Sequence, residues 1–481
     1  MSGVHAMKLS EYAAHDATGL MELVRRGEVT AAELHQCAMQ AIARLNPALN
    51  FMSGPAAPAA HGDGPFAGLP FLFKESHGCA GQPQMQGSRL ACGLTAQADT
   101  EFVARLKRAG VAPLGATTAP EFGLYCTTES SLHGATRNPW NLAHSVGGSS
   151  GGSSAAVAAG VVPVASSSDS GGSIRGPAHC TGTFGLKPSR ARVPIDGKND
   201  GGLFPFIHYH VTTRSVRDSA AFLDVLEGPT PGSRYPLPRP VRPFIREVGT
   251  DPGKLRIGVL RAAPLLTPLH ADCLAAVDAA ARLCVDLGHM VEEASPRLDW
   301  VTLMDAFVAS MMSVLPHSIA ALELATGRKA GPDTLEPMTL RAIGYAKSLG
   351  IPDLYKADAA LQDARRAVDA FFQEFDVWIT PAGVSPAPRI GAFDPAATEE
   401  GFLEYAHRTL SDYAAFTPLL NVTGNPAASV PLHHGSASGL PVGVQIVTRH
   451  GDEATLLRLA SQWEAAMSWR PRHPSQSVFD G

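Results

Sequence analysis

The sequence lacks the patterns that mark several classes of protein. Its seven cysteines are odd in number and widely spaced, and no two form a CxxC pair, so neither a disulfide framework nor a zinc or thioredoxin-like motif is indicated. Basic residues are not in excess, because the formal net charge is −5. Proteins that bind nucleic acid or anionic membranes usually carry a basic surface. We therefore expect neither partner.

Membrane spans, export signals and metal sites are not indicated either. Residues 1–16 contain no apolar segment behind a basic start, which a secretory signal requires. The longest apolar run, at 155–165, contains Pro163 and is too short to cross a bilayer. The histidines at 208–210 and 433–434 lack a third metal ligand at a recognisable spacing. These observations predict a cytoplasmic protein with no membrane association, metal or cofactor.

The features that are present predict an α/β fold. Hydrophobic residues make up 45 % and charged residues 17 % of the 481 positions, as in globular proteins. From about residue 66 to 165, short apolar runs alternate with helical stretches, which is typical of a sheet with helices on its faces. Predicted strands are LPFLF (69–73), VAPLGA (111–116), VVPVA (161–165), LRIGVL (255–260), VWITPA (377–382) and PVGVQIV (441–447). Predicted helices are 99–109, 271–287 and 453–466.

Capping and composition divide the rest of the chain. Asp16 is expected to cap a helix through Arg26, and Thr30 with Glu33 has the spacing of a capping box for a helix that ends near Asn46 and Pro47. Residues 228–253 hold seven prolines and four glycines and are predicted to form a surface connection. The expected parts are N-terminal helices (about 10–50), a core (about 66–230), a mainly helical insert (about 266–375) and a C-terminal sheet and helix (376–470).

A glycine and serine tract, GGSSGGSSAAVAAG, occupies residues 147–160. It could be a flexible linker, but an Ala/Val run follows at once, which places the glycines at the mouth of a buried helix with free N–H groups. Residues 148–152 also match GxSxG, the nucleophile elbow of α/β-hydrolases. That elbow follows a strand, whereas the preceding 138–146 contain Pro139 and show little β alternation.

A second polar segment, SDSGGSIRG, follows the apolar VVPVASS at residues 168–176. Its glycines allow consecutive N–H groups to converge on one point, as an oxyanion hole requires. Ser173 directly after them could place its hydroxyl beside the same point. The alternative is an ordinary Gly-Gly turn in which Asp169 and Arg175 form a surface ion pair.

Lys74 ends the apolar segment GLPFLFK. A lysine at such a position is either an edge residue whose amine reaches solvent or a buried amine. Lowering its pKa from about 10.4 to about 7 takes roughly 4 to 5 kcal/mol, which burial can supply. A neutral lysine can act as a general base.

Together these stretches resemble the amidase signature family. The tract GGSSGGSSAAVAAG and the segment DSGGSIR carry the resemblance, with Ser149 and Ser173 twenty-four positions apart. Further matching stretches are GLPFLFK (68–74), APEFG (119–123), GATRNPWN (134–141), FGLKPS (184–189), NVTGNPAASVP (421–431) and LPVGVQIV (440–447). The resemblance implies one α/β/α domain over residues 1–481, built around a large twisted mixed β-sheet with helices on both faces.

The resemblance also implies roles for individual residues. Ser173 would be the nucleophile, Ser149 the bridging serine usually held by a cis peptide bond, and Lys74 the base. The oxyanion hole would be formed by the N–H groups of Ser170, Gly171, Gly172 and Ser173. Candidates for supporting this frame are Ser150, Asp169 and Arg175. The chain departs from the family at Ala116, Thr118 and Ser168, where lysine, asparagine and threonine are common, which leaves the local support and the substrate rim open.

The expected reaction is hydrolysis of a carboxylic amide C–N bond through an acyl-enzyme, and the overall sequence resembles the branch that includes 6-aminohexanoate-cyclic-dimer hydrolases and urethane-cleaving amidases. Residues 201–210 are aromatic and residues 303–315 are rich in Met and Phe; if either lines the cleft rather than the core, the small-molecule substrate has a bulky apolar or aryl group. One alternative is a urethane or ester hydrolase with the same triad. A second is a glutaminase subunit of a tRNA-dependent amidotransferase, although the sequence at 190–202 does not resemble the corresponding segment of that subunit. A third is a non-catalytic binding protein. A monomer or homodimer is expected.

Overall fold

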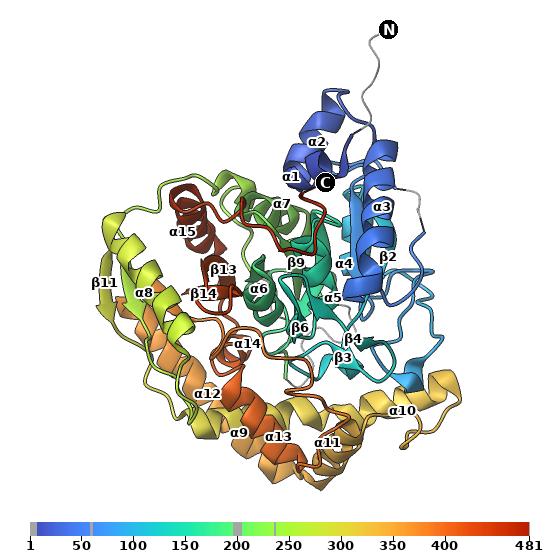
Figure 1. Ribbon diagram of the computed structural model, residues 1–481. Coiled ribbons are helices and arrows are strands. Elements are labelled where there is room, and N and C mark those ends of the chain that lie inside the picture. The colour runs from blue at the N-terminus through green and yellow to red at the C-terminus, as the bar shows by residue number, and fades with distance from the viewer. Residues whose placement is uncertain (1–6, 58–60, 196–203, 235–236, 481) are drawn as a thin grey trace.

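A ten-stranded mixed sheet occupies the centre of the protein (Figure 1). The computed structural model describes residues 7–57, 61–195, 204–234 and 237–480. The strand order is β11-β10-β12-β14-β13-β8-β9-β7-β1-β2. The strands are β1 (Pro70–Lys74), β2 (Ala112–Thr117), β7 (Val164–Asp169), β8 (Phe184–Lys187), β9 (His208–Thr213), β10 (Arg256–Val259), β11 (Met290–Glu293), β12 (Val377–Pro381), β13 (Ala427–His434) and β14 (Pro441–Thr448).

Parallel pairing brings the functional segments to one edge of this sheet. Strand β1 runs parallel to both β2 and β7, so β1 and β7 finish at the same edge, with Lys74 and Asp169 as their last residues. All five residues of β1 are buried, which accounts for its unbroken apolar sequence. On the other side of β7 the pairing with β9 is antiparallel. The sheet is therefore mixed, as predicted.

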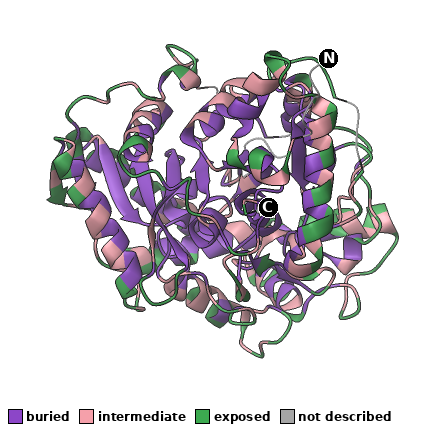
Figure 2. Ribbon diagram, turned by 45° about the horizontal axis from the view of Figure 1, so that its top comes forward, coloured by how far each residue is buried: buried purple, intermediate pink, exposed green. Residues whose placement is uncertain are grey.

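Helices flank the sheet and cover it from solvent. In Figure 2 most strands of the sheet are coloured as buried, whereas the flanking helices carry both buried and exposed residues. The edge strand β11 is the exception, because three of its four residues are exposed. The helices are α1 (Leu9–Ala14), α2 (Ala17–Arg25), α3 (Ala31–Leu49), α4 (Glu101–Arg108), α5 (Gly151–Ala158), α6 (Arg175–Thr181), α7 (Val216–Leu226), α8 (Ala271–Asp286), α9 (Trp300–Ser313), α10 (Leu315–Thr326), α11 (Pro337–Ser348), α12 (Ile351–Glu374), α13 (Phe402–Asp412), α14 (Pro418–Thr423) and α15 (Glu453–Ala466), with short 3-10 turns η1 (Arg89–Ala91), η2 (Glu121–Gly123) and η3 (Phe244–Arg246). The predicted α/β class is confirmed.

Two local expectations need correction. Helix α3 begins with the predicted capping box but continues past Pro47 to Leu49, although Pro47 has no N–H to donate to the carbonyl four residues before it. The segment before the glycine and serine tract does contain a strand, β6 (Asn141–Ser145). It pairs with β5 (Arg137–Asn138) in a hairpin outside the main sheet, as does β3 (Glu129–Ser130) with β4 (Gly134–Ala135).

The helical insert is shorter than the sequence predicted. Strand β11 joins the main sheet beside β10, and α8 packs against β12, β13 and β14. The segment that leaves the sheet layer is therefore α9 to α12, seen along the bottom of Figure 1. Strands from both sides of the proline-rich connection 228–253 meet in one sheet. The assignment of the whole chain to one domain stays a prediction.

One apolar helical stretch meets the length and composition of a membrane span. It covers Trp300–Thr326, with a mean hydropathy of 1.4, and it consists of α9 and α10, which meet at Val314. This stretch lies outside the apolar run at 155–165. Helix α9 packs against α12 and carries eight buried residues, so we interpret the stretch as part of the helical insert.

Candidate active site

Lys74 lies buried at the end of β1, with 1 % of its surface exposed. Its Nζ is 2.7 Å from Ser149 Oγ, 3.1 Å from Ser150 Oγ and 3.0 Å from Ser168 Oγ. The interpretation of Lys74 as an edge residue that reaches solvent is therefore wrong. Instead, three serine hydroxyls surround the amine.

The environment of Lys74 favours its uncharged form. Burial lowers the pKa of Lys74 to about 7, although the charges of Asp169 and Glu75 act in the opposite direction. The Ser150 hydroxyl donates to the Ser168 carbonyl at 3.1 Å, so towards Lys74 it accepts. A neutral amine that donates its two hydrogens to Ser150 and Ser168 keeps its lone pair for the Ser149 hydroxyl.

The glycine and serine tract is the start of a buried helix and not a linker. All eight residues of α5 are buried, and the peptide bond between Gly148 and Ser149 is cis, as the family resemblance implied. A Cβ at Gly151 would collide with the Thr128 hydroxyl, so glycine is needed there for close packing. The Ser150 N–H donates to the Ser173 carbonyl at 3.2 Å. This bond joins the tract to the second polar segment.

Asp169 organises the turn that contains Ser173. Its carboxylate accepts the main-chain N–H groups of Gly172 at 2.7 Å and Ile174 at 3.1 Å. It also accepts Nη2 and Nε of Arg175 at 2.9 and 3.0 Å. Both side chains of this ion pair are fully buried, so the alternative of a surface pair is wrong. Burial alone would raise the pKa of Asp169, but the charge and hydrogen bonds of Arg175 outweigh it and hold the pKa well below its usual range.

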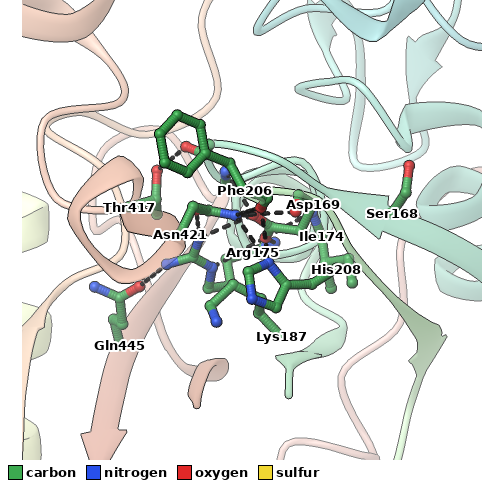
Figure 3. A network of polar contacts seen from close by, with 12 residues as sticks. Ser168, Asp169, Ile174, Arg175, Lys187, Phe206, His208, Thr417, Asn421 and Gln445 are labelled. Carbon is green, nitrogen blue, oxygen red and sulfur yellow. Dashed lines mark hydrogen bonds and ion pairs between the residues drawn. The ribbon is translucent and has the colours of Figure 1, made fainter. Parts of the chain in front are cut away.

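The Asp169–Arg175 pair is fixed from two distant segments, as Figure 3 shows. The Asn421 amide of α14 donates to the Asp169 carboxylate at 2.8 Å and to its carbonyl at 2.9 Å. Arg175 donates to Asn421 Oδ1 at 2.6 Å and to Gln445 Oε1 of β14 at 2.7 Å. Ser168 points away from this network in Figure 3, because neighbouring strand residues face opposite sides, and thus it reaches Lys74.

One of the four amides expected in the oxyanion hole is already occupied. The Gly172 N–H points to Asp169 Oδ1, so it is not free to bind a developing oxyanion, and we correct the expectation for this residue. In the described part of the chain, no protein acceptor is found for the N–H groups of Ser170, Gly171 and Ser173. These three amides remain candidates.

A cavity opens in front of the turn. Gly148 and residues 170–173 are among the residues that line it. The other walls come from α9, α13 and the start of α14, together with residues 123–126. Within 303–315, Phe307, Val308, Met311 and Met312 face the cavity, whereas Leu303 and Met304 pack in the core. Phe206, from the other aromatic stretch, contacts Phe307 at 5.6 Å between ring centroids; residues 201–203 of that stretch lie outside the described residues.

The structure brings the predicted residues into one place. Lys74 contacts Ser149 directly, and Ser173 lines the cavity next to Gly148. No hydrogen bond between the Ser149 and Ser173 hydroxyls is found among the described residues. Of the departures from the family, Ser168 contacts Lys74, and the Thr118 hydroxyl lies 2.7 Å from the Thr136 hydroxyl.

Sequence reasoning missed several supporting residues. Ser168 departs from the family pattern, and its place one residue before Asp169 on a strand puts it on the Lys74 side. Asn421 and Gln445 belong to matching stretches, but nothing local in the sequence assigns them to Arg175. Across the described residues, no group of three or more His, Cys, Asp and Glu side chains is arranged to hold a metal ion.

Comparison with known proteins identifies the family. A family model described as Amidase matches residues 30–457. The chain is 36 % identical over 491 aligned residues to a 6-aminohexanoate-cyclic-dimer hydrolase from Pseudomonas sp. (strain NK87), with 95 % of this chain and 96 % of that protein covered. It is also 36 % identical to a putative amidase AmiC from Mycobacterium leprae, with 98 % of each covered.

Solved structures agree with the sequence relatives. A structure of 6-aminohexanoate cyclic dimer hydrolase complexed with substrate superposes with a TM-score of 0.89 at 33 % identity, covering 96 % of this chain and 99 % of that chain. A bacterial aryl acylamidase of the amidase signature family, at 24 % identity, shares the fold with a TM-score of 0.85 over 97 % and 98 % of the two chains. The protein therefore belongs to the amidase family, and the resemblance drawn from its motifs is confirmed. It is a hydrolase that acts on amide C–N bonds, and it is similar to 6-aminohexanoate-cyclic-dimer hydrolase.

Proposed function

We propose that the protein hydrolyses neutral amides that carry a bulky apolar or aryl group, through an acyl-enzyme on Ser173. The observation that carries the proposal is the buried Lys74 amine 2.7 Å from the Ser149 hydroxyl, beside the cavity that Ser173 lines. A lysine with a pKa near 7 is matched to general-base work at neutral pH.

Acylation begins when Ser173 Oγ attacks the amide carbonyl carbon. Its proton passes to Ser149, and the proton of Ser149 passes to Lys74, so that a new C–O bond forms without free alkoxide. The free N–H groups of the turn receive the negative charge on the carbonyl oxygen. Collapse of this intermediate breaks the C–N bond, while Ser149 protonates the leaving amine and regains a proton from Lys74.

Deacylation repeats the same proton path with water. A water molecule attacks the acyl carbon as its proton passes through Ser149 to Lys74. The C–O bond to Ser173 then breaks, and Ser173 recovers a proton by the reverse route. The products are a carboxylic acid and an amine, and the enzyme returns to its starting state.

The lining of the cavity supports a neutral, apolar substrate. Its lining residues include no Lys, Arg, Asp, Glu or His among the described residues, so a charged substrate group would lose its hydration without a partner. Two of the lining hydroxyls are already used, since Tyr405 donates to the Phe393 carbonyl and Thr417 to the Gly171 carbonyl. Apolar contact with residues such as Phe307 and Met312 is left to select the substrate.

The glutaminase alternative is less well supported by this cavity. Glutamine carries an ammonium and a carboxylate, and each would need a partner of opposite charge. The tract 190–202, which also bears on this alternative, lies partly outside the described residues. Urethane and ester cleavage use the same acyl chemistry and stay as alternatives, to be separated by assay.

Covalent labelling tests the catalytic part of the proposal. A fluorophosphonate should modify Ser173, located by peptide mass spectrometry, and Ser173→Ala should abolish both labelling and amide turnover. Ser170→Ala keeps its main-chain N–H and should still be labelled at Ser173. Labelling at another residue, or turnover by Ser173→Ala, would refute the nucleophile assignment. Absence of labelling and of hydrolysis on every substrate would favour the non-catalytic binding protein.

A matched pair of anilides tests the substrate class. Hexanoyl anilide should be hydrolysed with a kcat/KM at least tenfold above that of 6-aminohexanoyl anilide, because burying the ammonium costs several kcal/mol. Acetylation of that amine should recover most of the loss. Equal rates, or a preference for the ammonium, would contradict the neutral-substrate proposal. An aryl urethane and a p-nitrophenyl ester with the same acyl length complete the comparison.

A further inference from the structure

Thr417 stands at the start of α14, more than 240 residues from the turn that contains Ser173. Its hydroxyl donates to the Gly171 carbonyl at 2.7 Å. The contact is close, because a Cβ on Gly172 would collide with the Thr417 side chain. Among the described residues, it is the only side chain that donates to a carbonyl of residues 170–173.

The peptide unit between Gly171 and Gly172 is held at both ends. Thr417 binds its carbonyl oxygen, and Asp169 Oδ1 binds its N–H at 2.7 Å. The next carbonyl, of Gly172, accepts the Gly176 N–H at 2.6 Å. Two adjacent glycines would otherwise rotate easily, since neither has a Cβ to restrict its backbone. Gly172 has a φ of +133°, a conformation that relies on its surroundings.

We propose that Thr417 is a positioning residue for the reaction, which fixes the oxyanion-binding turn by locking the Gly171–Gly172 peptide. Rotation of this peptide would bring the Gly171 carbonyl oxygen close to the N–H groups of Ser170, Gly171 and Ser173. The negative oxyanion of the intermediate would then face a hydrogen-bond acceptor instead of donors. The inference rests on the proposed role of Ser173 and its turn. It adds a residue that belongs to neither the proton path nor the motif of the turn.

The contact is expected to matter in the transition state more than in substrate binding. The Thr417 hydrogen is already donated to Gly171, so it is not available to the substrate. Loss of the hydroxyl should therefore lower kcat while KM changes little, which is the signature of an interaction needed in the transition state. A role in packing alone would change stability and leave kcat unaffected.

The test compares Thr417→Val, which keeps the shape and removes the donor, with Thr417→Ser, which keeps the donor. We expect Thr417→Val to lower kcat about 10- to 100-fold, with KM within about twofold of wild type, and Thr417→Ser to recover to within about threefold. Thr423→Val is the matched control, because Thr423 ends the same helix and its buried hydroxyl has no partner among the described residues. It should have wild-type kcat.

Labelling separates failure of this inference from failure of the proposed function. The rate of fluorophosphonate labelling at Ser173 should fall in Thr417→Val in parallel with kcat. If wild-type Ser173 is not labelled, the proposed function fails first. If wild type is labelled but Thr417→Val keeps wild-type kcat, or loses it only through KM, the role of Thr417 is refuted. Should Thr417→Val unfold below the assay temperature, Thr417→Ala decides by the same criteria.

Discussion

Asp169 and Arg175 form an ion pair in which two hydrogen bonds, of 2.9 and 3.0 Å, join side chains with no exposed surface. Removing one partner leaves the other as an uncompensated buried charge. Asp169→Asn should therefore lower the free energy of unfolding by about 3 to 5 kcal/mol, measured by denaturant titration. It should also abolish activity, because the amide has one acceptor oxygen where the carboxylate has two, so the N–H groups of Gly172 and Ile174 cannot both keep their acceptor.

An exposed ion pair provides the control for this prediction. Asp363 and Arg366 face each other on the surface of α12, with about 70 % of each side chain exposed. Asp363→Asn should leave both the denaturation midpoint and the activity unchanged, since solvent screens such pairs. If Asp169→Asn were as stable as this control, the buried pair would have no structural importance.

The pH dependence of turnover should follow Lys74. Since the base must be uncharged and burial brings the pKa of Lys74 to about 7, kcat/KM should rise with pH to a plateau, with a midpoint near 7. Glu75 lies next to Lys74 and raises its pKa, so Glu75→Gln should move the midpoint to lower pH. A profile that is flat from pH 5.5 to 9, or a midpoint that moves upward in Glu75→Gln, would count against Lys74 as the base.

Glu336 should make the protein less stable as the pH rises. Burial, followed by the nearby Glu121 carboxylate, raises the pKa of Glu336 from 4.5 to about 8. Between these values the folded state holds a proton that the unfolded state has lost, so stability falls by about 1.4 kcal/mol per pH unit in this window. Below pH 4.5 the contribution is fully present, and above 8 it is lost.

Replacement of the carboxyl by an amide tests this effect. The Glu336 Oε1 accepts the Ser131 N–H at 2.9 Å, a contact that Gln can keep. Relative to wild type, Glu336→Gln should gain in Tm between pH 5 and pH 8.5, whereas the exposed Glu292→Gln should show a constant difference. A constant difference for Glu336→Gln as well would show that Glu336 does not titrate in this range.

Gly171 and Phe307 should show a compensating pair of substitutions. A Cβ on Gly171 would lie 2.9 Å from Phe307 Cζ, so Gly171→Ala should displace the turn and lower kcat/KM about 10- to 100-fold. Phe307→Ala removes the ring that causes the clash. The double variant should therefore be more active than Gly171→Ala alone, and a double variant no better than the single one would place the damage in the backbone of Gly171.

The parts of the fold and site that could be predicted are those that depend on a short, continuous stretch of sequence. The unbroken apolar run before Lys74 gave the buried strand, and the Ala/Val run after Gly152 distinguished a helix start from a linker. The motif around Ser173 supplied the family, which the comparisons confirm. The roles assigned to Lys74, Ser149 and Ser173 remain predictions, although the structure brings them together.

The parts that could not be predicted depend on contacts between distant segments. Asn421 and Gln445 reach Arg175 across some 250 residues, and no local pattern marks such a pairing. The Gly172 amide is a local exception, because its acceptor Asp169 lies only three residues before it. The composition of the motif does not fix the conformation of the turn, and that conformation decides which N–H groups are free. Composition does not assign residues 303–315 to the core or to the cleft, because an apolar helix with two buried faces has the same composition on both.

Much of the cavity wall comes from stretches of chain other than those that hold the residues proposed to react. Helices α9 and α13 form much of the wall, while Lys74, Ser149 and Ser173 all lie within the first 175 residues. Substitutions in the two helices are therefore expected to alter which amide fits without moving Lys74, Ser149 or Ser173. Exchanging the cavity-lining residues of α9 and α13 should therefore change the substrate range, while the residues proposed to carry out the reaction stay the same.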